Sequence, residues 1–467
     1  MRRLSGIDAD MLYGETESCH MHVCGLLVLD PSSAPWGFGL DAWRSLVASE
    51  VEHLPPLRER LVPVPLGLDR PVWVDDPAFD LDRHLHHVAL PAPGGARELA
   101  ALVGGLAGYK LDRSHPLWEM WFIEGLQGGR LAVFSKVHHA CLDGMAGAML
   151  LGRLFRSERT RPPRLAEPLR AEAARVPSGL ELLARGLAAS PRAPLRVARA
   201  FGETASAFRN LARMRGSGEG WPALPFQAPR TSLNRPVTPR RSFAFAELPL
   251  AEVKAVKQAF GVTVNDVVLA LCSGALRRYL DERDELPAEP LVAAVPVSTR
   301  SGAQMGSFGN IVSGMFAPLA TDVADPAERL RAVSAGTRGA KRLYETGIED
   351  AVMRWAALPR PAAVALAVRF ASWLRLSERL PPIFNLLISN VPGPPVPLYA
   401  GGARLVACYP MGPLVDHVAL NVTVMSCGDA LGFGFLTCPE ALPDPWALAD
   451  GVSTALDELR GAVPAAP

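Results

Sequence analysis

Apolar positions alternate with polar ones, or gather into short runs, at eight places along the chain, and each place predicts a β-strand. Two lie in the first third of the chain, at residues 22–30 and 131–137. The other six lie in the second half, at residues 242–248, 291–297, 311–316, 384–389, 418–425 and 431–436.

Apolar residues at helical spacing predict helices between these strands. Asp41 begins one that the pair Pro55-Pro56 ends, and its buried face carries Trp43, Leu46 and Val47. Further helices are expected at residues 145–155, 179–189, 195–214 and 250–260. The order of strands and helices lacks the regular alternation of a parallel barrel, so we expect a mixed α/β (α+β) fold.

A change of composition near residue 161 indicates how the chain is divided. At 467 residues and 50.0 kDa it is long enough for two domains. Between Arg161 and Arg215, eleven arginines and four acidic residues give a local net charge of +7 (11 − 4), with six prolines. We therefore expect an N-terminal domain at residues 1–160, a basic linker at 161–240 and a C-terminal domain at 241–467.

Charge is balanced over the rest of the chain. The 48 Lys and Arg residues against 47 Asp and Glu give a net charge of +1, so nucleic acid is not an expected partner. The basic linker is then either a solvated crossover or a surface that rests on anionic lipid, at the inner membrane or a lipid droplet.

The cysteines and the apolar runs indicate where the protein resides. The seven cysteines are scattered and none forms C-x-x-C, which favours a reducing cytoplasm over disulfides or structural zinc. The N-terminus has no apolar core of a signal peptide. The best apolar run, residues 361–368, is too short to cross a bilayer, which needs roughly 20 residues. We expect a cytoplasmic protein without a transmembrane segment.

The segment His138-His-Ala-Cys-Leu-Asp-Gly144 carries the most distinctive chemistry, because it lies between a predicted strand and a predicted helix. An imidazole with a pKa near 6.5 can take and return a proton at neutral pH. Adjacent strand residues point to opposite faces, so the pair cannot comfortably chelate one metal ion. The pair is either two ordinary core histidines or a catalytic site. Asp143 would pin the turn or orient an imidazole, and Gly144 permits close packing.

The remaining motifs exclude several mechanisms. His84 and His86 can share one face of a strand, but no ligand spacing follows them, so they indicate a polar edge rather than a metal site. G-x-S-x-G, S-x-x-K, Walker and dinucleotide signatures are missing from the sequence. We therefore expect no covalent serine mechanism, no metal and no cofactor.

The heptapeptide matches the HHxxxDG signature of coenzyme A-dependent acyltransferases, which chloramphenicol acetyltransferases and peptide-synthetase condensation domains share. Other segments are similar to the bacterial wax ester synthase/diacylglycerol acyltransferase family: Leu4-Ser-Gly-Ile-Asp8, Met21-His-Val23, Pro116-Leu-Trp-Glu119, Asn265-Asp266, Gly309-Asn310 and Ser389-Asn-Val-Pro-Gly-Pro394. The resemblance extends from Leu4 to about Pro445 and is weakest in the basic linker.

This resemblance implies two chloramphenicol acetyltransferase-like domains with an active-site channel between them. It implies that His139 is the general base, with His138 supporting it and Asp143 orienting the site. The substrate-binding candidates that follow from it are Pro116, Leu117, Trp118, Gly144, Asn265 and Ser389, with Asp266 and Asn390 as structural motif residues.

Asp266 has a structural interpretation that is independent of the resemblance. Thr263 followed three residues later by Asp266 is typical of a capping box, with Thr263 as the N-cap of a helix. Asn265 and Ser389 are the candidate donors for the oxyanion of an acyl-transfer intermediate.

The expected activity is direct transfer of a long-chain acyl group from acyl-coenzyme A to diacylglycerol or a long-chain alcohol. The product would be triacylglycerol or a wax ester, and acyl-coenzyme A would be a co-substrate. Two alternatives share part of this pattern. One is a condensation-type enzyme that uses a carrier-protein thioester, and the other is a non-catalytic lipid-binding protein.

Overall fold

The computed structural model describes residues 2–141, 151–163, 175–189, a few positions from 202 to 209, 227–298, 312–346 and 381–463. Asp143, Gly144, Gly309 and Asn310 lie outside these residues, as do the apolar run 361–368 and most of the basic linker. The same holds for most of the expected helices at residues 145–155 and 195–214.

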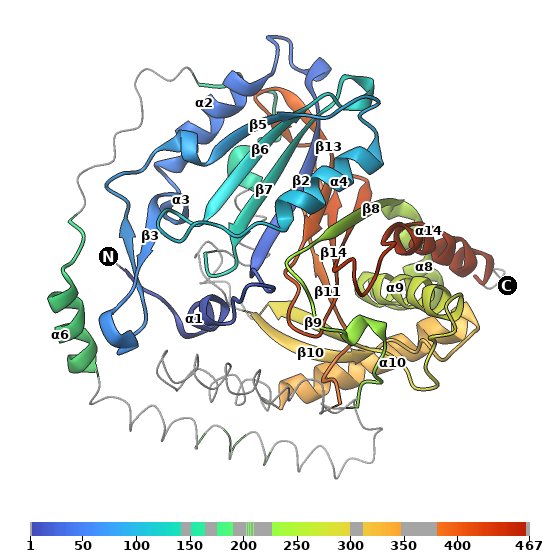
Figure 1. Ribbon diagram of the computed structural model, residues 1–467. Coiled ribbons are helices and arrows are strands. Elements are labelled where there is room, and N and C mark those ends of the chain that lie inside the picture. The colour runs from blue at the N-terminus through green and yellow to red at the C-terminus, as the bar shows by residue number, and fades with distance from the viewer. Residues whose placement is uncertain are drawn as a thin grey trace.

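The first sheet has six strands in the order β12-β13-β2-β7-β6-β5 (Figure 1). Its strands are β2 (His22–Asp30), β5 (Leu85–Ala89), β6 (Trp118–Glu124), β7 (Leu131–His138), β12 (Tyr399–Ala400) and β13 (Ala403–Met411). Only β5 and β6 pair in parallel, and β2 and β7 align so that His22 faces His138. Both strands expected in the first third of the chain are confirmed.

The second sheet also has six strands, in the order β10-β9-β11-β14-β15-β8. They are β8 (Ser242–Pro249), β9 (Val292–Ser298), β10 (Val312–Pro318), β11 (Leu386–Val391), β14 (Leu420–Cys427) and β15 (Ala430–Thr437). β11 pairs in parallel with both β9 and β14, and the other pairs are antiparallel. All six strands expected in the second half are confirmed, with ends shifted by one or two residues.

Strand pairing crosses the domain limits expected from composition. β12 and β13 follow the second half of the chain but belong to the first sheet, where β13 pairs with β2. Two glycines of β15 allow this approach. A Cβ on Gly432 would lie 2.1 Å from the Cys408 carbonyl oxygen, and one on Gly434 would lie 2.0 Å from that of Pro410. The limits at residues 160 and 240 stay a prediction: the second sheet keeps to the expected C-terminal domain, whereas the first sheet takes strands from both expected domains.

Helices cover both sheets, as Figure 1 shows. On the first sheet, α2 (Leu40–Val51) and α4 (Ala96–Ala107) pack against opposite faces. On the second, α9 (Val264–Asp281) and α14 (Trp446–Gly461) pack together beside α8 (Leu250–Phe260) and α10 (Pro326–Glu345). The remaining elements are α1 (Gly6–Tyr13), α3 (Pro55–Arg58), α6 (Gly179–Ala189) and a small sheet of β1 (Arg2–Arg3), β3 (Glu59–Val62) and β4 (Val72–Asp75).

Most helix predictions in the described residues hold. α2 buries the expected face, but it ends at Val51, and Pro55-Pro56 opens α3 instead of closing α2. Proline is tolerated in the first turn of a helix, where its missing N–H would have no partner. α6 and α8 match the expected ranges.

One apolar core joins the two sheets. It contains Leu26 and Phe134 of the first sheet, Val103 of α4, and Phe243 and Leu436 of the second sheet. In the described part of the chain, no individual helix is long and apolar enough to cross a membrane. Only α8 and α9 together, bent by 103°, reach that composition.

Candidate active site at the end of β7

The two adjacent histidines lie in a turn whose backbone is fixed from both sides. The N–H of His138 donates to the Leu117 carbonyl (2.9 Å), and the N–H of His139 donates to the Met21 carbonyl (2.8 Å). Met21 has a positive φ of 50°, which is uncommon for a residue with a side chain and marks local strain. Cys141 closes the turn by donating to the His138 carbonyl (2.9 Å).

His138 uses both ring nitrogens inside the protein. Its Nδ1 accepts the Ala140 N–H (3.0 Å), and its Nε2 lies 3.1 Å from Oε2 of Glu15. Burial lowers the pKa of His138, and the Glu15 carboxylate offsets this only in part. The ring is therefore neutral and has no nitrogen left for a substrate. His139 is only half-buried, so the two neighbours have different surroundings.

Glu15 contacts the motif although no sequence pattern marked it. Its side chain is 6% exposed and forms ion pairs with Arg113 (2.6 Å) and Lys110 (3.6 Å). Burial alone would raise the pKa of Glu15, but hydrogen bonds from His138 and Arg113 lower it to about 2. Glu15 is therefore a carboxylate at neutral pH. It lies 123 positions from His138, and only the fold brings the two together.

Two more histidines line the same face of the first sheet as His138. The His22 and His138 rings meet edge-on with centroids 6.1 Å apart, and His20 lies 5.6 Å beyond His22. Burial lowers the pKa of His22 far below its ordinary value, and the nearby Lys136 ammonium acts in the same direction. These neutral rings pack beside the turn on the α4 side of the sheet.

Pro116, Leu117 and Trp118 lead into β6, beside the turn. Leu117 and Trp118 are fully buried, and the Leu117 carbonyl holds the His138 N–H. The Trp118 indole donates to the Leu57 carbonyl (2.9 Å), and its ring stacks on His84 at 4.5 Å. The structure thus places these residues as packing support for the turn, and their role in substrate binding stays a prediction.

Asp266 has the structural role that the sequence indicated. It exchanges hydrogen bonds with Thr263, and this capping box at the start of α9 confirms the prediction. Its carboxylate also accepts from the hydroxyls of Thr337 (2.6 Å) and Ser334 (3.3 Å) on α10. Asp266 therefore links α9 to α10 by hydrogen bonds.

Asn265 of α9 and the Ser389 side chain lie on opposite sides of β11. The amide of Asn390 donates to Oδ1 of Asn265 (3.5 Å), which joins two of the motifs on the α9 side. Ser389 alternates with Asn390 and shares its face with Val391. Val391 packs in one apolar cluster with Val137 and Cys141, which flank the two histidines. Ser389 is thus on the face of β11 that is turned away from α9, the same face as Val391.

The polar edge expected at His84 and His86 is wrong for His84, which lies just before β5, the edge strand of the first sheet, and is buried. His84 is buried between Phe79 and Trp118, while His87 forms an exposed pair with Glu124 (2.7 Å). Within the described ranges, no group of three or more His, Cys, Asp and Glu residues is arranged to hold a metal ion.

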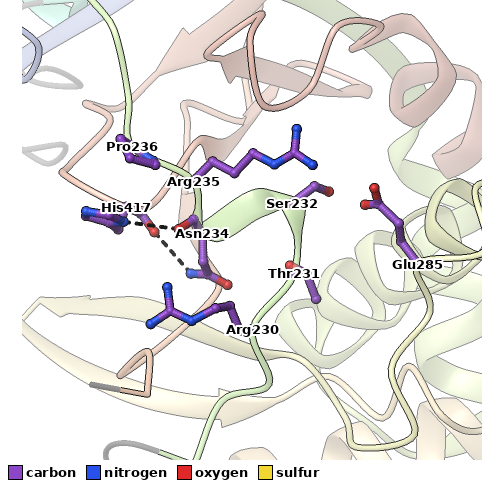
Figure 2. Close-up of a pocket in the computed structure, with 8 residues that line it drawn as sticks. All are labelled: Arg230, Thr231, Ser232, Asn234, Arg235, Pro236, Glu285 and His417. Atoms are coloured by element: carbon purple, nitrogen blue, oxygen red, sulfur yellow. Dashed lines mark hydrogen bonds between the residues drawn. The ribbon is translucent and has the colours of Figure 1, made fainter. Parts of the chain in front are cut away.

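An open cavity of about 450 Å³ lies elsewhere, and none of its lining residues belongs to the histidine turn. Figure 2 shows Arg230 and Arg235 extending from one segment, with Glu285 facing that segment from the loop after α9. The Asn234 amide donates to the carbonyls of Phe384 (3.1 Å) and His417 (3.0 Å). The lining is completed by Thr231, Ser232 and Pro236.

Comparison with known families covers most of the chain. Residues 4–268 match the wax ester synthase/diacylglycerol acyltransferase catalytic domain, and residues 308–460 match the WS/DGAT C-terminal domain. The chain belongs to this family. It is therefore an acyltransferase, as the HHxxxDG resemblance implied.

Relatives of this WS/DGAT acyltransferase match it over nearly the full length. A Mycobacterium tuberculosis protein, provisionally named a diacylglycerol O-acyltransferase, is 42% identical over 463 residues, covering 98% of this chain and 90% of its own. A second protein from that organism with the same provisional name is 38% identical over 465 residues, covering 99% and 96%.

Solved structures confirm the mixed α/β fold that the family implies. The wax ester synthase/diacylglycerol acyltransferase from Marinobacter aquaeolei VT8 is 32% identical with a TM-score of 0.69, covering 99% of this chain and 100% of that one. The first condensation domain of the CDA synthetase, at 16% identity, shares the fold with a TM-score of 0.58 and covers 99% and 97%.

Proposed function

We propose that this WS/DGAT acyltransferase moves a long-chain acyl group from acyl-coenzyme A to diacylglycerol or a long-chain alcohol, with His139 as general base. The unequal surroundings of the two histidines carry this proposal. His138 has both ring nitrogens engaged, whereas His139 is partly exposed at the end of β7. The names of the Mycobacterium and Marinobacter relatives support a lipid alcohol as acceptor.

Direct transfer needs one proton carrier. His139 removes the hydroxyl proton while the alcohol oxygen attacks the thioester carbonyl. When the tetrahedral intermediate collapses, the C–S bond breaks and the thiolate recovers the proton from His139. The products are an ester and free coenzyme A. Because the thioester is already activated, this reaction requires no cofactor.

We assign the oxyanion donor to Ser389 in preference to Asn265. The Ser389 hydroxyl lies on the face of β11 that shares a core with the histidine turn, whereas Asn265 is engaged with Asn390 on the α9 side. A hydroxyl donor that is in place before reaction stabilises charge as it develops on the carbonyl oxygen. The active-site channel would then lie between the end of β7 and the end of β11.

The deciding experiment supplies the purified protein with labelled palmitoyl-coenzyme A and either diacylglycerol or hexadecanol. We expect ester and free coenzyme A, and we expect His139→Ala to lower kcat by about 10²- to 10⁴-fold, as is usual for loss of a general base. Circular dichroism checks that the variant stays folded. A folded His139→Ala that retains activity within about tenfold of the original would overturn the assignment.

The same assay separates the alternatives. Ester formation only from a carrier-protein thioester would indicate a condensation-type enzyme. Binding of the acyl donor without turnover would indicate a lipid-binding protein.

We also propose that the protein contacts an anionic lipid surface, because its expected substrates partition into lipid. The net charge of +7 between residues 161 and 215 favours such contact. In the described residues, two exposed leucines lie near each other, because Gly179 packs against Pro65. They are Leu180 of α6 (78% exposed) and Leu66 (81% exposed). Long apolar side chains exposed beside basic residues are typical of surfaces that rest on a membrane.

A further inference from the structure

We propose that Glu15 is a positioning residue for His139: it holds His138 in one tautomer and, through His138, fixes the turn that carries His139. This inference rests on the proposed function for its kinetic consequence. Its structural part stands on hydrogen bonds of the described residues alone.

The geometry around His138 admits one tautomer. Ala140 donates its N–H to Nδ1, so Nδ1 carries no proton and acts as acceptor. The proton of the neutral ring is therefore on Nε2, which donates it to Oε2 of Glu15 at 3.1 Å. In the other tautomer a proton on Nδ1 would face the Ala140 N–H, donor against donor. Glu15 thus stabilises the tautomer that the turn requires.

The hydrogen bond from Ala140 to His138 spans His139. It links the side chain of the preceding residue to the backbone of the following one, so it restrains both backbone dihedrals of His139. The Met21 carbonyl restrains the same residue through its N–H. A change at Glu15 would release the first restraint and leave the second in place.

Two cationic side chains, Arg113 and Lys110, keep the Glu15 carboxylate ionised and in position to accept from His138. Nε and Nη2 of Arg113 donate to its Oε2 (3.1 and 2.6 Å), and Lys110 lies 3.6 Å from its Oε1. Arg113 also donates to the Leu12 carbonyl (2.9 Å), which anchors it to the end of α1. The low pKa of Glu15, about 2, agrees with a carboxylate that stays ionised whenever the enzyme is folded at neutral pH.

The chain offers a matched control. Glu17 has the same charge, lies two positions away and pairs with the same Lys110 (3.0 Å), but its side chain is 93% exposed and its carboxylate does not touch His138. We compare Glu15→Ala, Glu15→Gln and Glu17→Ala in the full-length protein. The glutamine oxygen can take the place of Oε2 toward His138 and Arg113, while its amide nitrogen takes the place of Oε1.

Two measurements are made on each variant. Long-range ¹H–¹⁵N correlation spectra of ring-labelled histidine report the His138 tautomer, with His138→Asn providing the assignment. Steady-state kinetics with palmitoyl-coenzyme A report kcat and KM separately.

We expect Glu15→Ala to lose the single Nε2–H tautomer and to lower kcat by about 10- to 100-fold, with little change of KM, because a loosened base is misplaced rather than removed. Glu15→Gln should keep the tautomer and stay within about threefold of the original kcat, since a neutral acceptor suffices for one hydrogen bond. Glu17→Ala should match the original protein in both measurements.

Three results would overturn the proposal. One is a Glu15→Ala variant that keeps the tautomer, and another is one whose kcat equals that of Glu17→Ala. The third is a Glu15→Gln variant that loses the tautomer, which remains decisive if Glu15→Ala does not fold. If the unmodified protein forms no ester, the proposed function fails, whereas the tautomer spectra still decide the role of Glu15.

Discussion

The buried histidines beside the turn depend on being neutral. Burial lowers the pKa of His20, His22 and His138 below the ordinary value of 6.5. At His22 the reason is visible in its contacts. Nε2 accepts the Leu111 N–H (3.4 Å), and the buried ammonium of Lys136 disfavours a second positive charge. A proton on Nε2 would replace this acceptor with a donor and break the contact.

Acid should therefore destabilise the protein through these rings. A group whose pKa is lower in the folded state binds protons more readily when unfolded, so its stabilising effect is present above about pH 6.5 and is lost as the pH falls. We expect the free energy of unfolding to decrease from about pH 7 to about pH 5, and less steeply in His22→Gln, whose amide oxygen can still accept from Leu111. Urea denaturation at several pH values measures this slope. The exposed His87→Gln serves as control, and a slope of His22→Gln equal to that of the original protein would contradict the assignment.

At the scale of elements, β13 is a strand that contacts both sheets. It pairs with β2 in the first sheet, while its carbonyls lie directly against β15 of the second. A Cβ atom on Gly432 or Gly434 would clash with a carbonyl oxygen of β13. Because backbone cannot yield as a flexible side chain can, these glycines are needed for the contact.

Gly434→Ala tests this joint. Its Cβ would lie 2.0 Å from the Pro410 carbonyl oxygen, so β13 must move away, and we expect a loss of about 1–3 kcal/mol or more in the free energy of unfolding. Gly314→Ala on β10 is the matched control, because nothing lies within 4 Å of its Cβ position. Denaturant unfolding of both variants measures the difference. Equal stability of the two variants would show that the close approach is not required.

Strand patterns also explain what the sequence could and could not predict. β2 and β7 follow the alternation or short apolar runs of their sequences, and Thr263 with Asp266 is a local signal, so all three were found. β13 contains Pro410 and an irregularity between Leu405 and Ala407, which together hide its period of two.

At the scale of the whole molecule, the site depends on contacts between distant segments. The sequence identified His138 and His139 because their spacing to Asp143 and Gly144 is local. Glu15 has no local pattern, since it lies in the polar loop after α1, and only the fold brings this loop to His138 at the end of β7. Val391, on the same face of β11 as Ser389, shares an apolar cluster with Val137 and Cys141, and this likewise follows from how β11 and β7 are placed, which periodicity does not specify.

The lipid-contact proposal is tested on the whole molecule by flotation with vesicles. Anionic lipid attracts each basic side chain near its surface with about 1 kcal/mol, and salt screens this attraction. We expect binding to anionic vesicles and not to neutral phosphatidylcholine, and release at high salt. Replacing Arg185, Arg192, Arg196 and Arg199 with glutamine should reduce binding by at least about tenfold. Leu66→Ser with Leu180→Ser should weaken binding at both low and high salt, because the lost contact is apolar. Unchanged flotation of the arginine variant would count against the basic segment as the contact surface.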